Sequence, residues 1–133
     1  MNPPIPQTET NMTIALVVDD DPVMRLLIRR ALEAGGFVVH EAENGRAGVD
    51  RFALLKPDIL LLDVLMPELD GFSACREIRA TLQGARTPIV MLTGLDDVES
   101  IDRALEAGAT DFIVKPMDWS NLANRVRRLL NPA

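Results

Sequence analysis

Residues 15–23 read ALVVDDDPV, an unbroken apolar run followed at once by three acidic residues, Asp19, Asp20 and Asp21. A continuous apolar run is typical of a parallel β-strand that is covered on both faces. The acidic residues follow at the carboxyl end of this strand, which is the edge where open parallel α/β sheets bind ligands. The stretch therefore predicts a fold class and, with it, the position of a site.

The rest of the chain alternates strand-like and helix-like segments. The predicted strands are TIALVV (13–18), FVVHEA (37–42), DILLLD (58–63), PIVMLT (88–93) and DFIVK (111–115). The predicted helices cover 23–34, 44–55, 71–82, 97–107 and 119–130. This order predicts an α/β fold of the (βα)5 type, a doubly wound parallel five-stranded sheet with helices on both faces. The second and fifth strands are expected at the sheet edges.

The size of the chain predicts a single domain. Its 133 residues, 47% of them apolar, are enough to build one hydrophobic core. We expect this domain at 13–130, after a proline-rich mobile N-terminal arm at 1–12 and before a short C-terminal end at 131–133. No secretory leader or membrane-length apolar run is visible, which favours a cytoplasmic protein without membrane contact.

Charge and cysteine content exclude several kinds of site. The 14 basic and 20 acidic residues give a net charge of −6, which argues against direct binding to nucleic acid, even at the arginine-rich run 125–130. A single cysteine, Cys75, and a single histidine, His40, exclude an internal disulfide and a thiolate–imidazole zinc cluster. Any metal site must therefore use oxygen ligands, and Cys75 is expected in the core.

Polar residues end four of the predicted strands. The acidic triplet ends the first strand, Asp63 the third, Thr93 the fourth and Lys115 the fifth. Carboxylates within about 6 Å of one another repel by a few kcal/mol per pair at an effective dielectric constant of about 20, so they require a cation. Oxygen ligation of this kind suits Mg²⁺, and the added lysine and hydroxyl suit a carboxylate that receives a phosphoryl group.

Four motifs carry a resemblance to a known family. VVDDDPVMR (17–25), DVLMPELDG (63–71), MLTG (91–94) and DFIVKP (111–116) resemble, in this order and spacing, the receiver domain of two-component response regulators. The resemblance extends from about residue 13 to residue 130. It implies a flavodoxin-like sheet with strand order 2-1-3-4-5 and a regulatory phosphoacceptor domain rather than an enzyme, which assists its own phosphorylation and slow dephosphorylation.

The resemblance also implies a phosphoacceptor and a metal site. Asp63 would take a phosphoryl group from a phosphohistidine on a sensor histidine kinase or a histidine phosphotransfer protein. Asp20 would bind Mg²⁺ (or Mn²⁺) directly, and Asp19 would bind it directly or through water. The Asp63 carboxylate and the backbone carbonyl of Leu65 would complete the protein ligands.

Further residues would hold the phosphoryl group and transmit its presence. By the resemblance, Lys115, Thr93 and the Gly94 amide would take phosphoryl oxygens, and Pro116 would hold the lysine loop through a cis peptide bond. Thr93 and Phe112 would form the switch. The inward rotation of Phe112 would remodel the face formed by 97–107, 111–115 and 119–130, which we expect to bind a downstream effector domain or protein.

That face also offers a dimer interface. The charged residues available there for pairs between two copies are Asp97, Asp102, Arg103, Asp111 and Arg125. Trp119, at the start of the last predicted helix, either caps the core or marks a docking surface. The segment 109–130 has a looser resemblance to receivers that precede GGDEF or EAL domains.

Two finer expectations concern neighbours of the site. Asp21 is expected to cap the first helix, with Pro22 at its first position, rather than to bind metal. Leu65 and Leu95 are apolar where faster members of the family carry polar groups that orient water, which predicts a long-lived phosphoryl group.

Two other functions remain open from the sequence. A flavodoxin-like cofactor binder would share the sheet, but it would need a phosphate-binding loop and aromatic residues where this chain has three acids. A receiver-like binding module that works without phosphorylation would share every feature of the fold. A hydrolase would require motifs that do not occur in the sequence.

Overall fold

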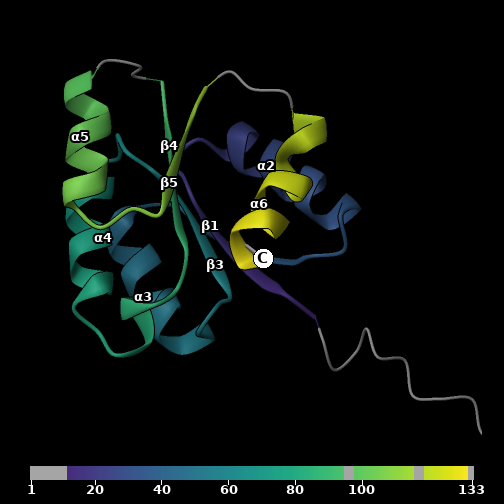
Figure 1. Ribbon diagram of the computed structural model, residues 1–133, viewed down its shortest axis with the longest axis horizontal. Coiled ribbons are helices and arrows are strands. Elements are labelled where there is room, and N and C mark those ends of the chain that lie inside the picture. The colour runs from purple at the N-terminus through teal and green to yellow at the C-terminus, as the bar shows by residue number, and fades with distance from the viewer. Residues whose placement is uncertain (1–11, 95–97, 116–118, 132–133) are drawn as a thin grey trace, which may run out of the picture.

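The computed structural model describes residues 12–94, 98–115 and 119–131. These residues form a five-stranded parallel sheet in the order β2-β1-β3-β4-β5 (Figure 1). Its strands are β1 (Ile14–Val18), β2 (Val38–Ala42), β3 (Ile59–Asp63), β4 (Ile89–Thr93) and β5 (Asp111–Val114). The predicted fold class and strand order are confirmed, and β2 and β5 are the edge strands, as expected.

Helices cover both faces of the sheet. They are α2 (Pro22–Ala34), α3 (Gly45–Leu55), α4 (Gly71–Arg79), α5 (Val98–Glu106) and α6 (Leu122–Leu130). Figure 1 shows α2 and α6 on one side of the sheet and α3, α4 and α5 on the other. No helix among the described residues is both long enough and apolar enough to cross a membrane.

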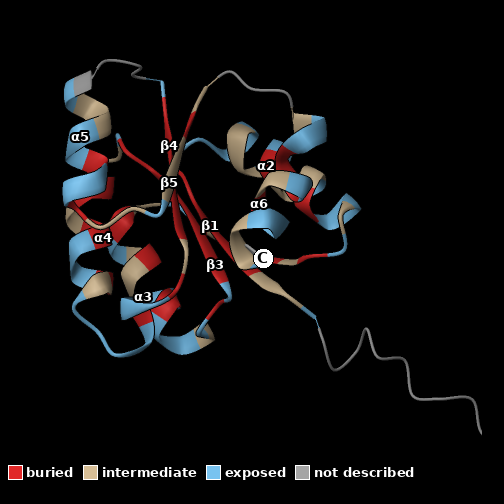
Figure 2. Ribbon diagram, in the orientation of Figure 1, coloured by how far each residue is buried: buried red, intermediate tan, exposed pale blue. Residues whose placement is uncertain are grey.

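The continuous apolar strands are explained by two separate cores. Leu16 and Val18 of β1 point into the core beneath α3, α4 and α5, whereas Ala15 and Val17 point into the core beneath α2 and α6. All four are fully buried, and Figure 2 shows the same burial along the central strands. Cys75 lies in the first core, as expected, and Trp119 packs against the second.

Two predicted helix boundaries were wrong by more than one residue. The helix expected at 71–82 ends at Arg79 and is followed by a 3-10 turn, Gln83–Ala85. The Thr81 hydroxyl explains this end, because it donates to the Ile78 carbonyl (2.7 Å) and accepts from the Gly84 amide (2.9 Å). The last α-helix begins at Leu122 rather than 119, after the 3-10 turn Trp119–Asn121.

Asp21 caps the first helix, as the sequence predicted. Its carboxylate accepts hydrogen bonds from the amides of Val23 (2.9 Å) and Met24 (3.4 Å), and Pro22 occupies the first helical turn. The cap satisfies amides that have no partner within the helix. It thereby fixes where α2 begins, immediately after the other two acids.

We expect Asp21→Ala to lower the free energy of unfolding by about 1 kcal/mol, because the cap hydrogen bonds are lost. Asp21→Asn is the matched control, since asparagine caps helices about as well as aspartate. Urea unfolding of the three proteins measures the difference. Equal stability of the alanine variant and the parent chain would show that the cap contributes nothing.

Candidate functional site

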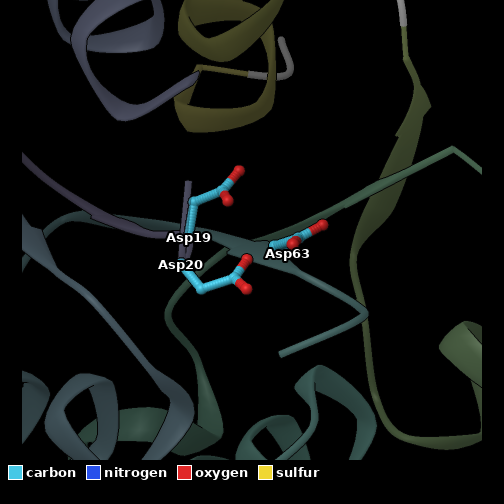
Figure 3. Close-up of side chains that lie close together, drawn as sticks. All are labelled: Asp19, Asp20 and Asp63. Atoms are coloured by element: carbon cyan, nitrogen blue, oxygen red, sulfur yellow. The ribbon is translucent and has the colours of Figure 1, made fainter. Parts of the chain in front are cut away.

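The carboxyl ends of β1 and β3 bring three carboxylates together. Asp19, Asp20 and Asp63 each offer an oxygen, and these oxygens all lie within 4.8 Å of one another (Figure 3). Asp19 is fully buried, Asp63 is 7% exposed and Asp20 is exposed. The adjacency follows from the sheet order, because β1 and β3 are neighbouring parallel strands.

Every polar group of Asp19 takes part in a hydrogen bond. Its amide donates to the Ala42 carbonyl of the edge strand (3.2 Å), and its own carbonyl accepts from Nη1 of Arg25 (2.7 Å). One carboxylate oxygen accepts from the Asp21 amide (2.9 Å), and the other accepts from Nζ of Lys115 (3.0 Å). The position of Asp19 is therefore fixed by β2, by the start of α2 and by Lys115.

Lys115 links two of the acids. Its Nζ lies 3.0 Å from Oδ2 of Asp19 and 3.1 Å from Oδ1 of Asp63. Burial alone would favour the neutral amine, but the hydrogen bond to Asp19 and the charges of both carboxylates outweigh it, so the pKa of Lys115 lies above its ordinary value. The Lys115 amide donates to the Thr93 carbonyl (2.7 Å), which ties this loop to the end of β4.

Asp63 has an unusually high affinity for a proton. Burial, the main cause, and the nearby negative charges of Asp19 and Asp20 raise its pKa to about 6, against the opposing effect of Lys115. The charged form is thus incompletely compensated by the chain itself. A further cation near the three carboxylates would favour the ionised form.

The loop after β3 owes its position to two glycines. The Gly71 amide donates to the Val64 carbonyl (2.8 Å), and a Cβ atom at Gly71 would lie 2.2 Å from the Asp63 carbonyl oxygen. A Cβ atom at Gly45, the first residue of α3, would lie 2.0 Å from the carbonyl oxygen of Leu69. No other residue fits such close approaches. Gly71 is the last residue of the motif DVLMPELDG (63–71), but the motif gives no sign of this packing requirement.

The other predicted site residues lie at the same edge of the sheet. Thr93 is 4% exposed at the end of β4, the neighbour of β3, and Gly94 follows it in an exposed position with open space beside it. Leu65 is 63% exposed, two residues after Asp63. Pro116 and Leu95 lie outside the described residues.

The expected switch residue Phe112 is half-buried on β5. Its side chain packs against the core beneath α3, α4 and α5, and its carbonyl accepts a hydrogen bond from Nη2 of Arg125 (2.9 Å). The same guanidinium pairs with Asp111 (3.1 Å). Asp111 and Arg125, which the sequence makes available for pairs between two copies, thus pair with each other within one chain.

Two others of the residues offered for a dimer lie on α5. Arg103 stacks over the ring of Phe72, 4.3 Å from its centroid, and so joins α5 to α4. Asp102 is exposed. Asp97 falls outside the described part of the chain.

Comparison with known proteins agrees with this geometry. A family model of the response regulator receiver domain matches residues 15–127. The chain belongs to this family. The response regulator MprA of Mycolicibacterium vanbaalenii is 44% identical over 115 residues, which make up 86% of this chain and 49% of that protein. The chain thus spans about half the length of MprA.

Solved receiver structures have the same fold. The chemotaxis response regulator CheY4 of Vibrio cholerae is 30% identical with a TM-score of 0.85, covering 90% of this chain and 99% of that chain. The receiver domain of the sensor histidine kinase PA1611 from Pseudomonas aeruginosa PAO1 is 33% identical with a TM-score of 0.83, covering 90% and 98%. That structure has a magnesium ion coordinated in its active-site cleft.

The residues of this receiver domain fit a magnesium ion. The donor set consists of carboxylate oxygens, which Mg²⁺ prefers, and the exposed Asp20 leaves room for the water molecules that Mg²⁺ retains. The raised pKa of Asp63 is consistent with this fit, because burial and the neighbouring acids disfavour its ionised form and a bound cation would favour it. The candidate site is therefore a carboxylate cluster suited to a divalent cation.

We expect Asp63→Asn to stabilise the metal-free protein at pH 7.5. Because the folded-state pKa of Asp63 is raised from 3.8 to about 6, the native state binds this proton more tightly than the unfolded state. The free energy of unfolding of the parent chain therefore falls by up to about 3 kcal/mol as the pH rises from about 4 to about 6. The advantage of the variant should be present at pH 7.5, shrink as the pH falls from about 6 to about 4, and be absent below about pH 4, where both states are protonated.

Urea unfolding in the presence of a chelator measures this pH dependence. Asp50→Asn, at an exposed position of α3, is the control for the loss of one carboxylate from the surface. An Asp63→Asn variant that is no more stable than the parent chain at pH 7.5 would contradict the expectation.

Proposed function

We propose that this receiver domain is the phosphoacceptor of a two-component phosphorelay and that Asp63 is the phosphorylated residue. The observation that carries the proposal is the position of Lys115, whose ammonium lies 3.1 Å from Asp63 Oδ1 within the carboxylate cluster. A carboxylate that is largely buried, next to an ammonium and a potential cation site, suits a nucleophile that must accept further negative charge.

The proposed donor is a phosphohistidine on a sensor histidine kinase or a histidine phosphotransfer protein. An oxygen of the Asp63 carboxylate attacks the phosphorus, and the P–N bond breaks with its electron pair going to the histidine ring. Lys115 then pairs with a phosphoryl oxygen and offsets the charge that arrives. The product is an aspartyl phosphate on this chain and an unphosphorylated histidine on the donor.

The proposed ligands for Mg²⁺ (or Mn²⁺) are Asp20, Asp63 and the backbone carbonyl of Leu65, with Asp19 acting directly or through water. The ion would neutralise charge on the phosphoryl oxygens when bound. The binding of Asp19 to Lys115 and to the Asp21 amide makes Asp19 the most constrained member of the set. Asp20 is the accessible member, which suits direct coordination.

The remaining oxygens are assigned to the Thr93 hydroxyl and the Gly94 amide. In this proposal Thr93 moves toward the aspartyl phosphate, Phe112 rotates inward, and the face formed by α5, β5 and α6 changes shape. That face would then bind a second copy of the chain or a downstream effector domain or protein. Pro116 would hold the Lys115 loop.

This function is regulatory rather than enzymatic. The proposed receiver unit is 13–130, flanked by an N-terminal arm at 1–12 and an end at 131–133. A cytoplasmic location follows from a phosphoryl donor of this kind. The acidic net charge of −6 supports protein partners over nucleic acid or an anionic membrane.

We expect the protein to gain one phosphoryl group when it is incubated with Mg²⁺ and a small acyl-phosphate donor. Intact mass spectrometry measures the gain. Asp63→Asn and a sample with chelator should show none, because the nucleophile or the cation is missing. Asp21→Asn, a change in the same acidic triplet that preserves the helix cap, should still be phosphorylated.

The same measurement separates the two remaining functions of this fold. Phosphorylation that requires both Mg²⁺ and Asp63 supports the phosphoacceptor role. A folded protein that gains no phosphoryl group from the acyl phosphate or from a phosphorylated histidine donor would favour a binding module that works without phosphorylation.

We expect the aspartyl phosphate to persist for minutes or longer, because Leu65, exposed beside the acceptor, cannot orient an attacking water molecule. Leu65→Asn should shorten the lifetime roughly tenfold, equivalent to about 1.4 kcal/mol in the barrier. Leu82→Asn, at a leucine that is 99% exposed and remote in sequence from the motif, is the control. A parent lifetime of only seconds would refute the expectation.

A further inference from the structure

Arg25 joins the acidic turn to the edge of the sheet. It lies in the first turns of α2, and only 18% of its side chain is exposed. Its Nη1 donates to the Asp19 carbonyl (2.7 Å), while its Nε donates to Oε1 of Glu41 on β2 (3.0 Å). Glu41 also accepts from Nη1 of Arg29 through its other oxygen (2.7 Å). The Arg25 guanidinium is therefore fixed by hydrogen bonds to both the Asp19 carbonyl and Glu41.

The carbonyl that Arg25 binds belongs to the peptide group between Asp19 and Asp20. A peptide group is planar, so fixing its oxygen fixes the plane from which the Cα atom of Asp20 extends. Among the described residues, none donates a hydrogen bond to the Asp20 carboxylate, whereas the Asp19 carboxylate accepts hydrogen bonds through both of its oxygens. The direction of the Asp20 side chain therefore depends on its backbone.

We propose that Arg25 is a positioning residue for the metal site: it orients the Asp19–Asp20 peptide and thereby aims the Asp20 carboxylate at the cation. Glu41 acts one step further out by holding the guanidinium. The inference rests on the proposed function, because it concerns the cation that phosphorylation requires. Residues that orient metal ligands in this way commonly contribute about 10- to 100-fold to metal affinity.

The charge of Arg25 makes the proposal distinguishable from simple electrostatics. A guanidinium close to a cation site repels the cation, so its removal without any geometric role would strengthen Mg²⁺ binding. Removal of a positioning residue weakens Mg²⁺ binding instead. The sign of the change in affinity therefore separates the two explanations.

A lysine at this position would keep the charge but not the geometry. The guanidinium is a rigid planar fork whose Nε and Nη1 donate to two different acceptors at once. An ammonium on a flexible stem does not reproduce that arrangement. Arg25→Lys thus tests the orientation of the peptide at constant charge.

Arg29 provides a matched control. It lies one turn along the same helix, carries the same charge and binds the same glutamate, but it makes no contact with Asp19. Its side chain is 40% exposed, so removal of its charge should have a small effect. Arg29→Met therefore reproduces the loss of one cation from α2 without releasing the Asp19–Asp20 peptide.

The test is a calorimetric titration of the full chain and its variants with Mg²⁺. We expect Arg25→Met and Arg25→Lys to weaken binding by about 10-fold or more, and Arg29→Met to leave it within about twofold. In the metal-free protein, loss of the hydrogen bond to the Asp19 carbonyl should shift the amide nitrogen resonance of Asp20 in both Arg25 variants. Phosphorylation should need more Mg²⁺ for half saturation, with its rate recovering at saturating Mg²⁺.

Each outcome decides the question. Unchanged or tighter Mg²⁺ binding in Arg25→Met, with the parent chain binding normally, would overturn the inference and leave the proposed function intact. If Arg25→Met does not fold, Arg25→Lys decides, because affinity equal to that of the parent would overturn the inference. A parent chain that binds no Mg²⁺ would overturn the proposed function and the inference with it.

Discussion

Electrostatic repulsion within the site is the constraint on which the rest of the structure depends. Three carboxylates place oxygens within 4.8 Å of one another at the ends of β1 and β3, and the ammonium of Lys115 binds two of them. Each pair of charges at such a distance costs a few kcal/mol at an effective dielectric constant of about 20. Burial first, and then the charges of Asp19 and Asp20, raise the pKa of Asp63 to about 6, against the opposing effect of Lys115. A cation and a phosphoryl group are ligands that such a site is suited to receive.

The fold separates the parts of the site that are fixed from those that stay accessible. Asp19 is buried and bound by the edge strand, by the first turn of α2 and by Lys115, so it acts as the rigid support of the cluster. Asp20 is exposed one residue later and depends on its backbone for direction. Gly71 allows α4 to begin against the Asp63 carbonyl, which limits the freedom of the loop after β3. A small parallel sheet thus holds one acid still while leaving another open to solvent.

The sequence was sufficient to predict the sheet and the convergence of polar residues at the strand ends. Both depend on apolar periodicity and on the rule that parallel strands end at one edge, and both are properties of short segments. It was insufficient to predict which groups the long charged side chains bind. No sequence pattern predicts that Arg25 binds the Asp19 carbonyl or that Lys115 binds Asp19 across 96 residues of sequence. Arg125 pairs within the chain rather than between copies. The end of α4 was also missed, because one hydroxyl at Thr81 outweighed helix periodicity.

The contacts of β5 restrict how the proposed switch can work. The Phe112 carbonyl is bound by Arg125, and the Lys115 amide is bound by the Thr93 carbonyl, so the backbone on both sides of Val114 is tied to its neighbours. Movement of the strand would break both hydrogen bonds, whereas rotation of the Phe112 side chain breaks neither. The aromatic ring is only half-buried against the core, which lowers the cost of its rotation. A signal from Asp63 would therefore reach the face of α5, β5 and α6 through side-chain rotation on a fixed strand.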